Sequence, residues 1–270
     1  MAREIRLYTK YPLIQDSEIT LEEGQSHYLA NVMRLKSGDN VSLFNGKDGQ
    51  WLAKITLINK KHTRIVPLNK THEQTYSPDL WLVFAPIKGK TELVAEKATE
   101  LGVSKILPVI TEHTIVRSLN SDKIEAHIIG AAQQCEMLNI PELEIVDNIT
   151  YLLDKWDKER ILLYGDESGG GEPLLETLIN IKQHNIHRGI NTGKSTVLIG
   201  PEGGFSESEF MILRKHSFAK GISMGPRVMK ADTAAVAALS CVQSVLGDWD
   251  KKPRFISEQI NKNNEKTTEE

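Results

Sequence analysis

From residue 80 onwards, short apolar runs alternate with segments of helical periodicity, and this alternation constrains the fold most. The run LWLVFAPI (80–87) is apolar throughout, which is typical of strands buried on both faces of a parallel sheet. Segment 90–102 follows with its apolar residues on one helix face and Gly102 at the position of a helix-terminating glycine. Further strands are expected at 105–110, 160–165, 196–200 and 221–225, and a last helix at 232–246. The alternation predicts an α/β domain with a mostly parallel sheet.

The N-terminal part of the chain has the character of an all-β module. Residues 40–69 contain three short β-rich runs, separated by NGKDG (45–49) and NKKHT (59–63), which are typical of hairpin turns. One short helix is expected over 26–35, with Ser26 as its N-cap. The pattern fits a compact β-barrel-like domain, and the polar stretch 71–79 has the composition of a linker.

Length and composition limit the number of domains and the classes of protein that fit this chain. A chain of 270 residues accommodates two modest domains, expected here at 1–74 and 78–250, with a polar tail at 251–270. The net charge of −3 means that any nucleic-acid site is a local patch. No apolar run approaches the ~20 residues of a membrane span, and the start lacks a signal-peptide core. The two cysteines lack metal-ligand spacing. We expect a soluble, cytoplasmic protein that binds no metal and no membrane.

Three glycine-containing loops leave the carboxyl ends of expected strands, where ligands bind in open α/β sheets. They are YGDESGGGEP (164–173), GPEGGFSE (200–207) and MGPRVMKADT (224–233). Two of them begin with Gly-Pro, which fixes the backbone and removes a donor, so we expect two rigid loops facing one ligand. The following helices carry cap signals: Ser206 with Glu209 as a capping box, and Asp232 or Thr233 for the last helix.

The segment GINTGKST (189–196) superficially resembles a nucleotide-phosphate loop. It has three residues between its glycines where that motif needs four, and it precedes a strand where the motif opens a helix. A polar surface loop is the better account of Lys194.

Two of these loops carry a family resemblance. LIGPEGGFSESE (198–209) and MGPRVMKADTAAVAAL (224–239) resemble the signature of the SPOUT-class RNA methyltransferases, and within them the family that methylates N3 of a uridine in 16S ribosomal RNA. Segments 88–111 and 131–143 resemble two further blocks of that family, and 27–39 resembles part of its PUA-like RNA-binding domain. The similarity covers about residues 1–248, with three departures from the family pattern at Gln133, Met137 and Lys230.

The resemblance implies a C-terminal α/β trefoil-knot domain, an N-terminal PUA-like β-barrel, S-adenosylmethionine as cofactor, and a homodimer. An alanine-rich face of the last helix would let a second helix approach closely, although packing onto its own sheet is the alternative. In the family, main-chain groups bind much of the cofactor, which explains why glycines are needed. Carried over to this sequence, the cofactor residues are Tyr164, Gly165, Ile199, Gly200, Pro201, Gly203, Gly204, Met224, Gly225 and Val228.

The implied reaction requires a deprotonated uracil N3, because that nitrogen carries a proton at neutral pH. Arg227 is the candidate for stabilising charge on the uracil carbonyls, with a structural ion pair or an RNA-phosphate contact as alternatives. Glu202 is the candidate for accepting the proton or positioning the donor. Its alternative is a carboxylate that braces the glycine loop.

The expected substrate is 16S ribosomal RNA or the small ribosomal subunit. Basic residues placed to contact it are Arg34, Lys36, Lys88, Lys90, Arg117 and Lys230. A non-catalytic RNA-binding factor for ribosome assembly is the main alternative, and a small-molecule methyltransferase is a weaker one. The intact pair of glycine loops favours the enzyme, because a protein that no longer binds the cofactor need not keep them.

Overall fold

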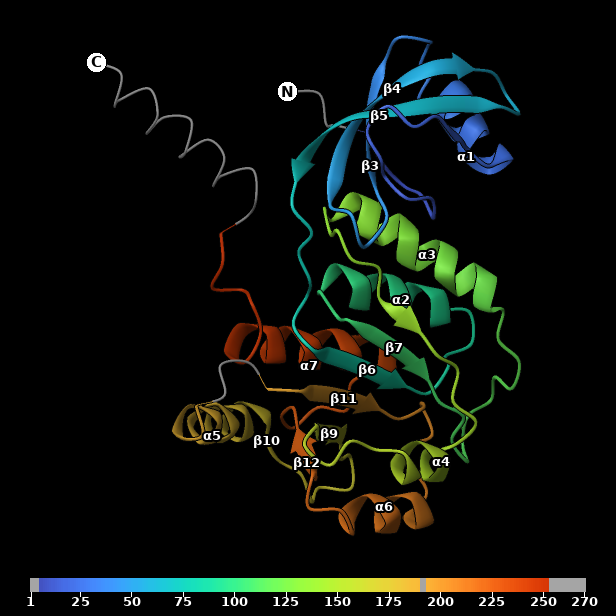
Figure 1. Cartoon of the computed structure of the whole chain (residues 1–270). Coiled ribbons are helices and arrows are strands. Elements are labelled where there is room, and N and C mark those ends of the chain that lie inside the picture. Colours follow the sequence, from blue (N-terminus) through green and yellow to red (C-terminus); the bar gives the residue numbers. More distant parts are fainter. Residues whose placement is uncertain (1–4, 190–192, 253–270) are drawn as a thin grey trace.

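The computed structural model describes residues 5–189 and 193–252, and in them the chain forms two sheets joined by a polar segment. The smaller sheet lies at one end of the molecule and rests on the helical layer of the larger α/β unit (Figure 1). The predicted polar tail, 251–270, falls almost entirely outside the described residues.

The N-terminal sheet has five strands in the order β1-β3-β4-β5-β2. They are β1 (Arg6–Tyr8), β2 (Ile19–Thr20), β3 (Asn40–Phe44), β4 (Gln50–Ile58) and β5 (Thr63–His72). Strands β3, β4 and β5 pair antiparallel, so both predicted hairpins are confirmed. Their inward side chains form a core of their own around Leu29, Leu43 and Ile55.

The short helix of this domain begins earlier than predicted. Helix α1 (Glu23–His27) continues into a π-helical turn, η1 (Tyr28–Val32). The N-cap is Glu22, whose N–H donates to the Gln25 Oε1 at 3.4 Å. Ser26 is fully buried inside the helix, so its assignment as the cap is wrong. Glu22 and Gln25 close the helix end reciprocally and leave no capping role for the serine.

The larger sheet has seven strands, all parallel, in the order β10-β12-β9-β11-β6-β7-β8. The predicted α/β class with a parallel sheet is therefore confirmed, and all five strands expected from apolar runs are present. Two further strands at the sheet edges, β8 and β10, have two residues each and too little sequence pattern to be predicted. The strands are β6 (Leu80–Phe84), β7 (Lys105–Pro108), β8 (Glu142–Leu143), β9 (Ile161–Gly165), β10 (Glu172–Pro173), β11 (Ser195–Ile199) and β12 (Ala219–Ser223).

Helices cover both faces of this sheet. Helices α2, α5 and α7 cover one face, α3 packs on α2, and α4 and α6 cover the other face (Figure 1). They are α2 (Thr91–Glu100), α3 (Ser121–Gln134), α4 (Ile149–Asp154), α5 (Leu174–His187), α6 (Glu207–Arg214) and α7 (Ala231–Val245).

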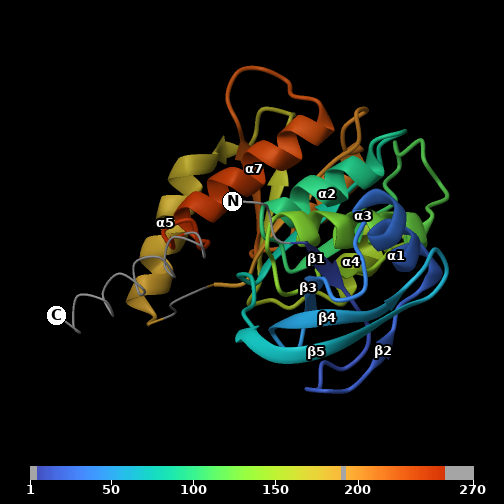
Figure 2. The same ribbon diagram turned by 90° about the horizontal axis from the view of Figure 1, so that it is seen from above.

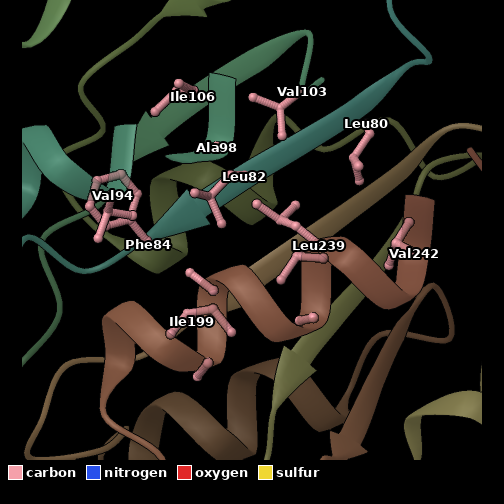
Figure 3. Close-up of a cluster of buried hydrophobic side chains, with 14 of the residues drawn as sticks. Leu80, Leu82, Phe84, Val94, Ala98, Val103, Ile106, Ile199, Leu239 and Val242 are labelled. Carbon is pink, nitrogen blue, oxygen red and sulfur yellow. The ribbon is translucent and has the colours of Figure 1, made fainter. Parts of the chain in front are cut away.

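Side chains along β6 point alternately to the two faces of the sheet, which explains why the strand has a continuously apolar sequence. Leu82 and Phe84 point into the cluster beneath α7, which Figure 3 shows around Leu239 and Val242. The neighbouring Val83 belongs to the cluster on the opposite face. Since both faces are covered, four of the five positions along the strand are buried and Trp81 is half-buried.

In the α/β unit, two of the predicted helix ends are confirmed and one is wrong. Gly102 follows α2 with a φ of +76°, the left-handed conformation expected there. Ser206 and Glu209 form the predicted capping box of α6. The N-cap of α7 is Lys230, which makes no side-chain cap, so neither Asp232 nor Thr233 has this role. Asp232 instead accepts a hydrogen bond from Lys90, with 2.5 Å between Oδ2 and Nζ.

The two domains are joined by a specific seam at the C-terminal end of α3. The buried guanidinium of Arg6 donates to the carbonyls of Ala132 and Gln133 at 3.0 Å and of Met137 at 2.8 Å. The side chain of Gln133 accepts from the N–H of Tyr8 at 2.9 Å. Two of the three departures from the family pattern therefore lie in this seam, where they hold the N-terminal sheet on α3. Figure 2 shows that sheet beside α3, on the opposite side of the molecule from α5.

Candidate functional site

A cavity of about 280 Å³ opens at the carboxyl ends of β9, β11 and β12. These strands are neighbours in the sheet, so the three loops that follow them converge on one space. Each of the three glycine-containing loops contributes to its wall, as does the first turn of α7. The lining residues are Gly165, Asp166, Glu167, Gly169, Ile199, Gly200, Pro201, Glu202, Gly204, Ile222, Ser223, Met224, Gly225, Pro226, Arg227, Val228, Met229, Ala231 and Ala234.

Most of the predicted site residues lie at this cavity. Gly165, Ile199, Gly200, Pro201, Gly204, Met224, Gly225 and Val228 line it, together with Arg227 and Glu202. Tyr164 and Gly203 do not. Tyr164 is buried on the other face of the sheet, 6.3 Å from Phe210 between ring centroids, because successive strand residues point to opposite faces. Gly203 faces His113 instead.

The glycine loop after β11, residues 200–206, is a compact turn whose shape excludes larger side chains. The N–H of Gly204 donates to the carbonyl of Pro201 at 2.9 Å, and Gly204 has a φ of +71°. A Cβ on Gly204 would lie 2.3 Å from Oε1 of Glu167, and one on Gly200 would lie 3.1 Å from the ring of Phe205. The left-handed backbone therefore favours glycine at Gly204, and a larger residue would also displace the Glu167 carboxylate.

Two carboxylates in the loop after β9 belong to the site and were not predicted. Glu167 lines the cavity, and its Oε1 accepts a hydrogen bond from the N–H of Phe205 at 3.0 Å. Asp166 is buried at the cavity wall and contacts Arg214 at 3.4 Å. Burial and this neighbouring carboxylate raise the pKa of Tyr164 above its ordinary value. In the sequence, their position directly after an apolar strand could have indicated that both carboxylates belong to the site.

The alternatives for the two candidate catalytic side chains can now be compared with the contacts. Arg227 makes no ion pair with any residue of 5–189 or 193–252. Glu202 is exposed at the cavity, and the brace of the glycine loop is Glu167. An RNA-phosphate contact remains the open alternative for Arg227.

The segment between β7 and α3, residues 109–120, contacts the glycine loop from outside the cavity. The Nδ1 atom of His113 lies 3.1 Å from the carbonyl oxygen of Gly203 and 3.0 Å from that of Gly204. The N–H of Glu112 donates to Glu209 at 3.0 Å. Since His113 and Gly203 are 90 residues apart in sequence, no local pattern could have identified this contact.

The predicted RNA-binding residues fall into three groups. Arg117 folds back onto its own segment, donating to the carbonyls of Thr111 and Glu112. Lys230 is the N-cap of α7 beside the cavity, and Lys90, the N-cap of α2, pairs with Asp232 in the first turn of α7. The remaining three side chains are exposed: Lys88 near the start of α2, and Arg34 and Lys36 in the N-terminal domain.

No three His, Cys, Asp or Glu side chains among the described residues are grouped as metal ligands would be. None of the helices in that part of the chain combines the length and the apolar character needed to cross a membrane.

Comparison with known families gives a match over most of the chain. Residues 75–243 match the family described as RNA methyltransferase domain, and residues 21–68 match the RNA methyltransferase PUA domain. Ribosomal RNA small subunit methyltransferase E of Rickettsia conorii is 32% identical over 88% of this chain and 94% of its own. The protein of the same name from Buchnera aphidicola (Schizaphis graminum) is 29% identical over 90% and 97%.

Solved structures show the same fold. A protein from Legionella pneumophila, described as a methyltransferase with the cofactor SAM bound, is 27% identical and aligns with a TM-score of 0.76 over 92% of this chain and all of its own. A Neisseria gonorrhoeae structure aligns with a TM-score of 0.77 over the same shares at 24% identity, which supports the fold alone.

Proposed function

This chain belongs to the ribosomal RNA small subunit methyltransferase E family, and we propose that it methylates N3 of a uridine in 16S ribosomal RNA. Family membership makes the protein an S-adenosylmethionine-dependent rRNA methyltransferase. The observation that supports the proposed site is the single cavity formed by three glycine-containing loops at adjacent strand ends. The proposal adds the identity of the acceptor atom and the roles of the cavity residues.

The cavity residues fit S-adenosylmethionine, which supplies an activated methyl group on a sulfonium when bound. Gly225 has a φ of +100°, and no other atom lies within 4 Å of the point where a Cβ would be. The main chain is therefore accessible at this wall. Ile199, Met224 and Ala234 add apolar surface at the cavity, while Asp166 and Glu167 add acceptors. This mixture of bare main chain, apolar surface and a few polar groups is typical of small-molecule sites.

Arg227 and Glu202 are the side chains we propose for the chemical step. Both line the cavity and both are exposed, so both are free to meet an incoming base. The guanidinium of Arg227 would stabilise negative charge on the uracil carbonyls as N3 loses its proton. The carboxylate of Glu202 would accept that proton or orient the base. Alignment of N3 with the methyl group depends on the loops that hold the cavity in shape.

RNA binding is proposed to involve both domains. We assign residues 1–74 to RNA recognition and 78–250 to catalysis, with the knot of the latter remaining a prediction. The exposed cations Arg34, Lys36, Lys88 and Lys230 are the proposed phosphate contacts, because none of them has an ion-pair partner among the described residues. Arg117 and Lys90 contribute less, since each already has an internal partner. The substrate is then 16S rRNA or the assembled small subunit.

A homodimer and a cytoplasmic location complete the proposal. The alanine-rich face of α7 does not support the dimer, because Ala234 and Ala238 are buried in the protein's own core. Helix α5 provides better support: Leu175, Ile179 and Ile186 are 57%, 42% and 65% exposed. Such apolar residues on a helix surface are typical of a face covered by a partner. A cytoplasmic location follows from the proposed ribosomal substrate.

Calorimetry with S-adenosylmethionine, combined with a methylation assay on small-subunit RNA, tests this function. We expect binding that is unchanged by a metal chelator, because transfer from a sulfonium needs no Lewis acid, followed by formation of N3-methyluridine. Absence of donor binding would favour the non-catalytic assembly factor. Methylation at another atom would contradict the proposed acceptor.

A further inference from the structure

The glycine loop is held between two side chains that come from other parts of the chain. On the cavity side, Glu167 accepts from the N–H of Phe205 at 3.0 Å. On the outer side, Nδ1 of His113 is within hydrogen-bond distance of two successive carbonyls, those of Gly203 and Gly204. Neither His113 nor Gly203 lines the cavity. The histidine therefore contacts the loop only from behind.

The chemistry of this contact fixes the proton on one nitrogen of His113. Carbonyl oxygens only accept hydrogen bonds, so Nδ1 must carry the hydrogen in order to bond them. The neutral imidazole does so in one of its two tautomers, and the imidazolium does so as well. One N–H shared between the two oxygens then directs both carbonyls away from the cavity.

The position of these carbonyls determines the shape of the cavity wall. Gly204 lines the cavity with a left-handed backbone that other residues rarely adopt, and the turn is closed by one bond from Gly204 to Pro201. A glycine-rich turn has many accessible conformations, and ordering it when the ligand binds reduces affinity. A hydrogen bond that orders the turn beforehand removes part of that cost.

We propose that His113 is a positioning residue that preorganises the glycine loop for S-adenosylmethionine, an inference that rests on the proposed cofactor site. It touches neither the cofactor nor the base. Its effect is on the affinity for the donor, because the loop shape matters for binding. Arg227 extends from the other Gly-Pro loop, and Glu202 lies in the held loop, which bound donor keeps ordered at saturation. The rate at saturating donor stays the same.

The test compares His113→Ala, His113→Asn and His127→Ala by calorimetry with S-adenosylmethionine and by steady-state kinetics. His127 is the matched control, since it contacts Glu96 on α2 and lies outside the cavity lining. The alanine variant at 113 should bind the donor roughly 3–10-fold more weakly, the usual range for one lost hydrogen bond, with KM raised and kcat unchanged. Asparagine retains an N–H donor and should recover most of the affinity. Equal affinities for His113→Ala and His127→Ala would overturn the proposal.

A spectroscopic measurement on the wild-type protein keeps the proposal testable if His113→Ala fails to fold. A histidine-selective 15N spectrum at neutral pH should show the hydrogen of His113 on Nδ1, with the signal assigned by its loss in His113→Asn. A hydrogen on Nε2 alone would contradict the contact. If the wild-type protein binds no S-adenosylmethionine, the proposed function fails, while the tautomer still decides whether the loop is held in this way.

Discussion

The two Gly-Pro loops share that dipeptide but have different surroundings. The first, residues 200–206, is held by Glu167 on one side and His113 on the other, and the Ser206 capping box fixes its exit into α6. The second, residues 224–230, projects outward, and Val228 on it is 92% exposed. Directly after this second loop in the chain, Asp232 in the first turn of α7 forms an ion pair with Lys90.

This difference gives each loop a separate task, cofactor binding for the first and the chemical step for the second, although both carry the same Gly-Pro motif. A held loop gives a cofactor a preformed surface, so it favours binding. An exposed loop whose Arg227 has no ion-pair partner in the part of the chain that the structure describes leaves room for a large substrate to approach, which favours the chemical step. We therefore expect changes in the shape of the first loop to alter donor affinity, and changes in the second to alter the rate. Glu202 is the exception, because the first loop carries this proposed reacting side chain.

Gly204→Val should have the largest effect, because it breaks the held loop. A β-branched residue at a φ of +71° is strained by on the order of 1–3 kcal/mol, and its Cβ would lie 2.3 Å from the Glu167 carboxylate. We expect donor binding to fall below detection in calorimetry. Gly130→Ala in α3 is the control, since no atom lies within 4 Å of its Cβ position and alanine favours a helix by about 0.5–1 kcal/mol. Normal binding by Gly204→Val would mean that the loop is only a turn.

Arg227→Ala should have the next largest effect and a different character. Removal of one preorganised charge stabiliser lowers a rate by roughly 10²–10³-fold, while the donor affinity should stay within about twofold of wild type because the held loop is intact. Single-turnover kinetics at saturating RNA measure the first quantity and calorimetry the second.

Two further variants test this role more closely: one replaces Arg227 by lysine, and the other removes an arginine far from the cavity. Arg227→Lys should recover only part of the rate, because lysine keeps the charge but loses the planar fork. Arg188→Ala, at the end of α5, should behave as wild type. An intact single-turnover rate with weakened RNA binding would make Arg227 a phosphate contact, and the catalytic role would pass to Glu202.

Glu167→Ala should weaken donor binding by roughly tenfold, the order expected when a charged acceptor leaves a backbone N–H without its partner. The exposed glutamate Glu125 on α3 provides the matched control in Glu125→Ala. The rate at saturating donor should be unchanged, as the brace contacts the first loop only. A reduced rate with unchanged affinity would contradict the division between the two loops.

Asp232→Asn should have the smallest effect. The hydrogen bond from Lys90 lowers the pKa of Asp232 below its ordinary value. The pair therefore stabilises the fold fully at pH values above the ordinary carboxyl pKa. This stabilisation is lost as the pH falls through the folded-state pKa of Asp232. At neutral pH we expect a loss of about 0.2–1 kcal/mol in the free energy of unfolding, as for other partly exposed pairs.

Denaturant unfolding across pH measures this contribution. The difference between wild type and Asp232→Asn should begin to fall near pH 4, around the ordinary carboxyl pKa, and should vanish only when the pH is below the lowered folded-state pKa. Asp122→Asn is the control, because Asp122 lies in the first turn of α3 as Asp232 does in α7. A difference that persists in acid would show that the pair is not its cause.

Local patterns were sufficient to predict the layers of the α/β domain and the position of the cavity. The run at 80–84 is apolar because helices cover both faces of the strand, and this leaves a direct trace in the sequence. The glycine loops can also be recognised in the sequence, since a left-handed turn beside a ligand needs glycine wherever it occurs. The Ser206 capping box is a four-residue signal and was confirmed for the same reason.

The failures share a different origin. Tyr164 was carried over with Gly165 from the family resemblance; its side chain lies on the face of the sheet away from the cavity, because successive strand residues face opposite sides. Ser26 was assigned as a cap, yet its position relative to β5 and the domain core decides that it is buried. The contacts of His113 and Glu167 with the glycine loop depend on pairing across many residues, which no single window of sequence contains.

Mass spectrometry of nucleosides from 16S rRNA is the most direct test of the central claim. RNA from a deletion strain should lack one N3-methyluridine, which a wild-type copy restores and a copy with Arg227→Ala fails to restore at normal protein levels. Retention of that nucleoside in the deletion strain, or loss of a different modification, would contradict the account.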